Sequence, residues 1–260
     1  MVRVRVRVRV RVSECSMKDL FSQGSALYHQ ARPQYSTEIV DTILQHVPER
    51  CLAWDCGAGS GQFTQLLVPH FQQILATDLS QAQLDLATQW ANVSYRTCLA
   101  QDSGLADASV DLITVAQAIH WFDFDAFYAE VHRVLKPSGV FAAVGYGLIQ
   151  VEDKAVNTEI QRLYAQTLKG YWDAERRYID DLYRTIPFPF QEIVTPELCL
   201  KYCWSAAQLL DYLNTWSGLQ HYLKQHTETP LLELQQLLRQ QPTQVFGIQF
   251  PVLLRLGRLA

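Results

Sequence analysis

Three glycines at alternate positions, Gly57, Gly59 and Gly61, follow the acidic residue Asp55 in the segment DCGAGSG. A short apolar run precedes this segment and a helical pattern follows it, so the glycines occupy a turn between a strand and a helix. Glycine allows a tight turn and a close approach of the backbone to a ligand, and the helix N-terminus presents free N–H groups. In an open α/β sheet such a turn borders the ligand crevice, so we predict a cofactor site there.

The acidic residue before the glycines indicates which cofactor the turn would bind. The dinucleotide fingerprint G-x-G-x-x-G would place glycine at position 62, where this chain has Gln62. Asp55 would repel a pyrophosphate, whereas it would attract a cationic group such as the ammonium of an amino acid. The pattern therefore favours a ligand with a cationic end. A nicotinamide-dependent oxidoreductase and a plain tight turn remain alternative interpretations.

Two further acidic residues follow predicted strands at similar spacing. Asp78 lies 23 residues after Asp55, and Asp102 lies 24 residues after Asp78. A carboxylate at the end of the second strand can accept from both hydroxyls of a ribose. One after the third strand can accept from an adenine amino group. Each aspartate alone could equally form a turn or cap a helix. The three together indicate an adenosine-containing ligand.

These residues need a scaffold in which successive strands end at one edge. Between residues 51 and 146, apolar strands alternate with helical patterns, which is typical of a doubly wound parallel sheet. The segment 110–116 is almost entirely apolar, as expected of a strand that is buried on both faces. The predicted strands are 51–55, 73–78, 93–98, 110–116 and 140–146, and the predicted helices are 60–69, 81–90 and 124–135.

The pattern changes on either side of this region. Residues 18–47 and 153–185 have helical patterns, the first interrupted at Arg32-Pro33 and the second rich in aromatic residues. Further strands are predicted at 198–204 and 244–259, the last bent or interrupted at Pro251, and further helices at 206–213 and 230–239.

Four segments of this chain resemble motifs of the class I S-adenosylmethionine-dependent methyltransferases. The segment 55–61 (DCGAGSG) resembles the first motif of that family, 76–80 (ATDLS) the second, and 106–112 (ADASVDL) the entry to its fourth strand. The segment 133–139 (RVLKPSG) resembles the common RVLKPGG, with Ser138 in place of the first glycine. The resemblance covers about residues 50–146. It implies a Rossmann-like, doubly wound, seven-stranded α/β fold, a helical insertion that covers the active site, and S-adenosylmethionine as the cofactor.

A narrower likeness comes from three segments outside those motifs. They are Tyr28-x-x-x-Arg32-Pro33-x-Tyr35, the segment 116–123 (AQAIHWFD) and the segment 214–217 (NTWS). Together they resemble the small-molecule branch that includes trans-aconitate methyltransferases. This likeness implies a small and acidic methyl acceptor.

Carried over by position, the resemblance implies a set of cofactor-binding residues. Arg32 could hold the carboxylate of the cofactor or of the substrate through its bidentate guanidinium, or it could simply end a helix before proline. The implied cofactor contacts are Asp55, Gly57, Gly59 and Gly61 around the methionine part, Asp78 on the ribose, Leu79 and Asp102 on the adenine, Ser103 beside Asp102, and Gln117 near the methionine part or the sulfonium.

The expected substrate pocket contains Tyr28, His120, Trp121 and Trp172, and we expect no metal. Methyl transfer from a sulfonium is an in-line displacement with an activated leaving group, so alignment and exclusion of water would be the main catalytic contributions. A carboxylate acceptor needs no base, whereas a hydroxyl or carbon acceptor would. His120 is the only candidate base, and lining the pocket is its alternative role. Arg176, Arg177 and Arg184 are either substrate contacts or surface charges.

Charge is distributed unevenly along the 260 residues. The net charge is −4, but residues 2–12 alternate valine with five arginines. Without them, 17 basic residues face 26 acidic ones, a net charge of −9, which argues against a nucleic-acid partner. We predict that residues 1–16 are a disordered low-complexity extension. Residues 17–260 are predicted to be one methyltransferase domain, with a cofactor-binding core at about 50–146, an insertion at about 150–195 and C-terminal strands at about 197–260.

No apolar run approaches 18 residues, and the six cysteines form no C-x-x-C pair. We therefore expect a reduced, cytoplasmic protein without a membrane span. Its partner would be a small-molecule acceptor. The sequence leaves open whether the protein is a monomer or a homodimer. A methyltransferase-like module that acts through a partner without catalysis is the remaining alternative.

Overall fold

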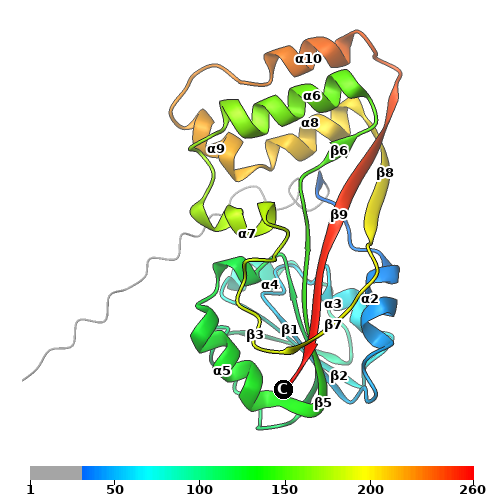
Figure 1. The fold of residues 1–260 in the computed structure, drawn as a ribbon, viewed down its shortest axis with the longest axis vertical. Helices are drawn as coiled ribbons and strands as arrows, with labels where there is room; N and C mark the ends of the chain where they lie inside the picture. The colour runs from blue at the N-terminus through cyan, green and yellow to red at the C-terminus, as the bar shows by residue number, and fades with distance from the viewer. Residues whose placement is uncertain (1–30) are drawn as a thin grey trace, which may run out of the picture.

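The computed structural model describes residues 31–260. The extension at 1–16, the helix expected before residue 31 and Tyr28 lie outside the described residues. Five parallel strands form the centre in the order β3-β2-β1-β4-β5 (Figure 1). They are β1 (Leu52–Cys56), β2 (Gln73–Asp78), β3 (Val93–Thr97), β4 (Val110–Ala116) and β5 (Leu135–Tyr146).

This arrangement confirms the predicted doubly wound sheet. The apolar segment at 110–116 is β4, which is the central strand between β1 and β5 and is buried along almost its whole length. Side chains from both of its faces enter separate apolar clusters, with Leu112 in one and Ile113 in the other. The helices that flank the sheet are α2 (Thr37–Leu44), α3 (Thr64–Leu67), α4 (Gln81–Leu84) and α5 (Phe124–Val134).

The long C-terminal strand β9 (Val245–Arg258) joins two parts of the molecule. One half runs antiparallel to β5 and to β7 (Gln191–Ile193). The other half pairs with β6 (Gln150–Val151) and with β8 (Cys199–Ser205). Pro251 lies where β9 changes partners and does not interrupt the strand.

Nine strands are therefore present in the described residues, not seven. The sixth and seventh strands predicted from the sequence are β8 and β9. The short β6 and β7 were missed because two or three residues carry no readable alternation. They form only because the long β9 offers them backbone partners.

A helical cap lies at one end of the molecule, beside the half of β9 that pairs with β6 and β8 (Figure 1). The expected helical insertion at 153–185 is confirmed as helical, but it is broken into several short pieces. Segments on both sides of β8 build this cap, including a helix at 217–223 that the sequence pattern did not indicate. Its elements are α6 (Lys154–Arg162), the π-helical turn η2 (Leu163–Thr167), η3 (Ala174–Arg176), α7 (Arg177–Asp180), α8 (Ala206–Asn214), α9 (Ser217–Leu223) and α10 (Leu232–Arg239).

Two helices of the sheet layer are shorter than predicted. The patterns at 60–69 and 81–90 become the single turns α3 and α4. Gly61 has a positive φ of 77°, which keeps the start of the first segment out of a regular helix. Beyond α4 only Ala87 is buried in the expected helix, so little packing energy supports further turns. Within residues 31–260, no helix has both the length and the apolarity needed to cross a membrane.

Candidate functional site

The glycine turn follows β1 and has the backbone geometry that its sequence predicts. Gly57, Gly59 and Gly61 have φ values of 73°, 56° and 77°, in the left-handed region that favours glycine. A Cβ on Gly57 would lie 2.5 Å from the Cβ of Ala118, so this position cannot carry a side chain without a shift. A Cβ on Gly59 would meet no atom within 4 Å. The turn is thus closed on one side and open at Gly59.

Asp55 is completely buried at the end of β1. Its two carboxylate oxygens accept hydrogen bonds from Thr64 Oγ1 at 2.6 Å and from Thr114 Oγ1 at 2.8 Å. Burial raises the pKa of Asp55 to about 6, although both hydroxyls oppose this rise. The residue therefore joins β1, α3 and β4 rather than presenting a free carboxylate to a ligand.

Asp78 joins the end of β2 to the glycine turn. Its Oδ2 accepts from the backbone N–H of Gly59 at 2.9 Å, and its Oδ1 accepts from the N–H of Ser80 at 2.9 Å. The side chain is only half-buried, so its remaining lone pairs can reach a ligand. The next residue, Leu79, is 44% exposed, which suits a side chain that packs on a planar ring.

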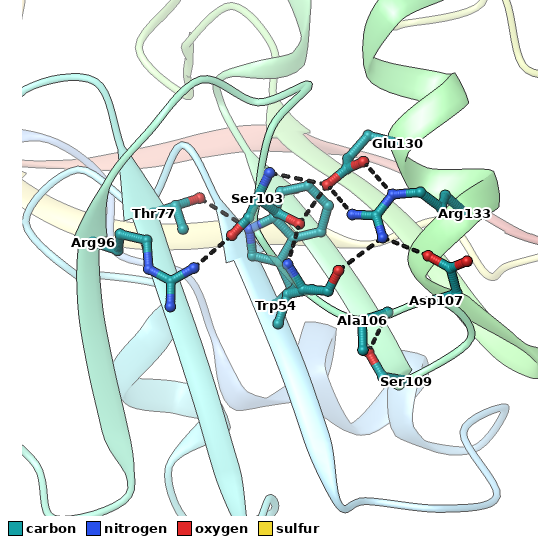
Figure 2. A network of polar contacts seen from close by, with 10 residues as sticks. Trp54, Thr77, Arg96, Ser103, Ala106, Asp107, Ser109, Glu130 and Arg133 are labelled. Atoms are coloured by element: carbon teal, nitrogen blue, oxygen red, sulfur yellow. Dashed lines mark hydrogen bonds and ion pairs between the residues drawn. The ribbon is translucent and has the colours of Figure 1, made fainter.

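The loop that carries Asp102 is held by a polar network (Figure 2). Glu130 Oε1 accepts from the N–H of Ser103 at 2.9 Å and from its hydroxyl at 2.5 Å. Arg133 donates to both oxygens of Glu130, and Arg96 donates to the carbonyl oxygen of Ser103 at 2.7 Å. Although burial opposes ionisation, these hydrogen bonds lower the pKa of Glu130.

This network gives the neighbouring residues Ser103 and Asp102 different environments, although the resemblance implies that both lie at the cofactor. Ser103 is fully buried, and both of its donors are engaged by Glu130. Its side chain therefore holds the loop against α5, and neither donor is left for a cofactor. Asp102 is exposed, so its carboxylate is available to an adenine amino group.

Gln117 directly follows β4 and has an unusual backbone conformation. Its φ is 54°, which is uncommon for a residue with a side chain and is frequent at functional sites. Its N–H donates to the carbonyl oxygen of Val144 at 2.9 Å, and its side-chain Nε2 donates to the carbonyl oxygen of Tyr146 at 3.3 Å. The glutamine is thus fixed at the carboxyl end of the central strand.

His120 lies in the short 3₁₀-helix η1 (Ile119–Trp121) that follows Gln117. It is 6% exposed, and its Nδ1 lies 3.3 Å from the hydroxyl of Tyr183. Burial, reinforced by the positive charges of Arg176 and Arg32, lowers the pKa of His120 to about 3. The imidazole is therefore neutral at pH 7.

Two buried tyrosines of the site, Tyr35 and Tyr183, come from segments that are far apart in the chain. Tyr183 was not among the predicted site residues, and no local pattern identifies it, because it comes from the chain segment after α7. Tyr35 belongs to the Arg32-Pro33-x-Tyr35 segment and is 8% exposed. Its hydroxyl has no hydrogen-bond partner among the described residues. Burial raises its pKa, and its ring lies 6.1 Å from that of Tyr146.

A pocket of about 460 Å³ opens beside η1. Its lining brings together the start of α5, the residues around α7 and the two predicted pocket residues His120 and Trp121. The ring of Phe122, which also lines it, would lie 3.4 Å from a Cβ on Gly57, so the pocket adjoins the glycine turn. The lining residues are His120, Trp121, Phe122, Asp123, Phe124, Asp125, Glu175, Arg177, Tyr178 and Pro187.

Trp172 does not line this pocket. Its ring packs against Tyr164 and Trp216 with centroid distances of 4.6 and 5.4 Å, and its Nε1 donates to the carbonyl oxygen of Tyr164. The absence of a side chain at Gly218 makes room for this ring, because a Cβ there would lie 2.8 Å from it. Trp172 is therefore held by packing partners from distant segments of the cap, and its place in the substrate pocket stays a prediction.

Arg32 connects two of the segments that carry the narrower likeness. Its Nε donates to Thr215 Oγ1 at 3.4 Å and its Nη2 donates to the carbonyl oxygen of Thr215 at 3.3 Å. Arg176 packs over the rings of Tyr164 and Trp172 at 5.3 and 5.1 Å. The positive charges of both guanidinium groups contribute to the low pKa of His120.

These features fit an adenosine-containing cofactor with an amino-acid end. Asp78 offers carboxylate oxygens next to the open position at Gly59. The hydroxyl of Tyr35 is a buried polar group without a partner in residues 31–260, and such a group normally has one. A methionine moiety at the glycine turn would supply that partner.

Comparisons with known proteins agree with this fit. Residues 54–143 match the family described as "Methyltransferase domain". A methyltransferase of Dictyostelium discoideum is 34% identical over 249 residues, covering 92% of this chain and 95% of that protein. A methyltransferase-like protein of Schizosaccharomyces pombe is 37% identical over 48% of this chain and 50% of its own length.

A solved structure extends the likeness to the whole fold. A type II methyltransferase from Anaeromyxobacter dehalogenans has 39% sequence identity and a TM-score of 0.81, covering 87% of this chain and 97% of that one. The nicotinamide interpretation of the glycine turn is thereby set aside. The chain belongs to the class I S-adenosylmethionine-dependent methyltransferases.

Proposed function

We propose that this enzyme methylates a small molecule that enters through the pocket at His120. This proposal rests on the position of that pocket. The pocket adjoins the glycine turn through Phe122, and the residues that follow the central strand β4 form part of its lining. A methyl acceptor there would lie next to the methionine end of the cofactor. The pocket volume of about 460 Å³ suits a small ligand.

The proposed cofactor contacts follow the strand ends. The glycine turn and the Tyr35 hydroxyl would hold the methionine part, Asp78 the ribose, and Leu79 and Asp102 the adenine. Gln117 and Arg32 would lie at the methionine end. When bound, S-adenosylmethionine supplies a methyl group on a sulfonium that leaves as a neutral thioether. The protein's part is to align the acceptor and to exclude water, which the buried aromatic surroundings of His120 favour.

A carboxylic acid is the first candidate acceptor. Arg32 and Arg176 support it, because the positive charges of both guanidinium groups act on the buried neutral His120 and would also attract a carboxylate. Arginine binds carboxylates through two parallel hydrogen bonds. Such an acceptor would need no base.

An acceptor that is methylated on an amine or a hydroxyl is the second candidate. The pocket itself is lined by Asp123, Asp125 and Glu175 against the single guanidinium of Arg177. This charge balance attracts a cationic group and repels a carboxylate. Trp121, Phe124 and Tyr178 add aromatic faces that suit the same kind of ligand.

Calorimetric titration with S-adenosylhomocysteine tests the cofactor site. We expect binding by the native protein and binding about 10- to 100-fold weaker in Asp78→Ala, because a charged hydrogen-bond partner is lost. Asp85→Ala is the matched control, since Asp85 accepts only from Gln81 on the surface of α4. Equal affinity of Asp78→Ala and the native protein would contradict the assignment of Asp78.

The acceptor class is tested with a panel of small acids, amines and phenols and S-adenosylmethionine labelled in its methyl group. Transfer to acids that is lost in Arg176→Gln would support the first candidate. Transfer to amines that is weakened in Asp125→Asn would support the second. Cofactor binding without transfer to any compound, together with capture of a protein partner, would instead support a non-catalytic module.

We propose three further properties that rest on the sequence. Residues 17–260 form one methyltransferase domain. The protein works in the cytoplasm on a small molecule and not on nucleic acid, because the chain after residue 12 has a net charge of −9. Whether it acts as a monomer or a homodimer is decided by light scattering.

A further inference from the structure

Three side chains form a continuous polar chain behind the pocket. Gln117 Nε2 lies 3.3 Å from the carbonyl oxygen of Tyr146, Gln117 Oε1 lies 3.3 Å from the hydroxyl of Tyr183, and that hydroxyl lies 3.3 Å from His120 Nδ1. Tyr183 is completely buried, so water cannot replace any of these contacts at its hydroxyl. The donor and the acceptor of each hydrogen bond follow from the carbonyl oxygen of Tyr146 at one end of this chain, because that oxygen can only accept.

The backbone end of the chain fixes the amide. A carbonyl oxygen can only accept, so the atom of Gln117 that faces Tyr146 must be the donor Nε2. Its Oε1 therefore faces Tyr183 and can only accept. The hydroxyl of Tyr183 has a single hydrogen, and this hydrogen must point to Gln117 Oε1 if that contact is to be a hydrogen bond.

The tyrosine then fixes the imidazole. Since the hydroxyl hydrogen of Tyr183 is used by Gln117, its contact with His120 is a hydrogen bond only when Nδ1–H of His120 donates to the tyrosine oxygen. The neutral ring carries one hydrogen, so Nε2 is left with a lone pair. The low pKa of His120 keeps the ring in this neutral form at pH 7.

His120 Nε2, the nitrogen that is left with a lone pair, belongs to a residue that lines the pocket. His120 Nε2 forms no hydrogen bond within residues 31–260, and it is not one of the fully buried polar atoms that lack a partner. Nδ1 is turned to the interior, so the opposite edge of the ring is the part that the pocket can reach.

We propose that Tyr183 is a positioning residue that holds His120 as its Nδ1–H tautomer, so that Nε2 accepts a hydrogen bond from an O–H or N–H group of the methyl acceptor. The proposal rests on the proposed function for the identity of the pocket as the acceptor site. It narrows the acceptor class: the group beside His120 carries a hydrogen. A carboxylate, if the acceptor has one, lies away from Nε2, because two lone pairs would repel each other.

Long-range ¹H–¹⁵N correlation spectra of the protein, labelled with ¹⁵N-histidine, test this tautomer without cofactor or acceptor. The signals of His120 are those that disappear in His120→Gln. In the native protein at pH 7 we expect a protonated-type shift for Nδ1 and an unprotonated-type shift for Nε2. In Tyr183→Phe the tautomer ratio should move by about tenfold toward Nε2–H, because one hydrogen bond that favours Nδ1–H is removed.

Tyr128→Phe is the matched control. It removes another buried tyrosine hydroxyl, which donates to the carbonyl oxygen of Pro187 and has no contact with His120. Its His120 shifts should equal those of the native protein. An unprotonated Nδ1 in the native protein would overturn the proposal even if Tyr183→Phe fails to fold, and an unchanged tautomer in a folded Tyr183→Phe would overturn the role of Tyr183. Loss of S-adenosylhomocysteine binding would count against the proposed function and not against the tautomer.

Discussion

Gly57 and Gly59 show how neighbouring residues of one motif can have different physical roles. Both have positive φ values, but a Cβ on Gly57 would collide with Ala118 whereas a Cβ on Gly59 would point into open space. The first glycine is therefore required by the fold. At the second, the fold requires only the left-handed φ, and the open space beside it is where the proposed cofactor would bind.

A pair of alanine substitutions separates these roles. Gly57→Ala should lower the free energy of unfolding by about 2–4 kcal/mol, since a steric clash adds to the cost of a left-handed alanine. Gly59→Ala should cost only the conformational part, about 1–2 kcal/mol. In the same proteins, S-adenosylhomocysteine should bind Gly59→Ala at least tenfold more weakly than the native protein. Urea unfolding and calorimetry measure both effects, and equal destabilisation by the two substitutions would contradict this division.

Asp55 makes stability depend on pH in an unusual direction. Its pKa is raised by burial from 3.8 to about 6 in the folded protein, so between these values the folded state holds a proton that the unfolded state has released. The contribution of Asp55 to stability is therefore present below about pH 4 and is lost as the pH rises through 6. The loss is on the order of 2–3 kcal/mol.

Asp55→Asn should remove this part of the pH dependence. Urea unfolding of both proteins between pH 4 and pH 7 provides the measurement. The free energy of the native protein relative to that of the variant should fall over this interval. A constant difference would show that Asp55 titrates alike in the folded and unfolded states.

At the scale of elements, the loop between β3 and β4 depends on a helix. Glu130, on α5, binds the backbone and side chain of Ser103, and Arg133 on the same helix donates to the carbonyl oxygen of Leu105 at 2.8 Å and pairs with Asp107 (Figure 2). The exposed Asp102 is thus positioned by contacts one residue away from it. A helix that touches no ligand would in this way control the adenine end of the site.

Glu130→Gln tests this dependence. The amide keeps an acceptor for Ser103 but loses the ion pair with Arg133, so unfolding should become about 1–3 kcal/mol easier. Binding of S-adenosylhomocysteine should weaken several-fold while binding of methionine alone does not change, because only the adenine end is affected. Glu38→Gln, on the exposed face of α2, is the control. An unchanged affinity for S-adenosylhomocysteine would contradict control of Asp102 by α5.

At the scale of the whole molecule, β9 joins the sheet to the helical cap (Figure 1). The cap has its own aromatic packing, in which Trp172, Tyr164 and Trp216 meet and Gly218 leaves room for them. Arg176 stacks on the ring of Trp172, and its positive charge helps to lower the pKa of His120. A change in the packing of the cap should therefore change the electrostatic surroundings of His120.

Gly218→Val should displace Trp172 and with it Arg176. We expect S-adenosylhomocysteine to bind about as well as to the native protein, because the glycine turn and Asp78 lie outside the cap. Methyl transfer should fall by about tenfold or more, as is usual when positioning is disturbed. Ala207→Val, on an exposed position of α8, should change neither quantity. A parallel loss of cofactor affinity in Gly218→Val would argue against this separation of cap and cofactor site.

The sequence by itself determined the parallel sheet and the cofactor motif. Both depend on short-range signals: the apolar run of β4 follows from burial on both faces, and the positive φ values of the glycine turn follow from local backbone sterics. Asp78 was predicted because strands of one parallel sheet end at the same edge, which holds whatever surrounds them.

Only the tertiary structure decided which side chains meet at the pocket. Tyr183 reaches His120 across 63 residues, Trp172 turns into the cap because Gly218 makes room for it, and Ser103 is used by Glu130. The strands β6 and β7 exist only because β9 pairs with them. Such contacts depend on the packing of distant segments, which neither periodicity nor motif spacing records, since both describe neighbours along the chain and not neighbours in space.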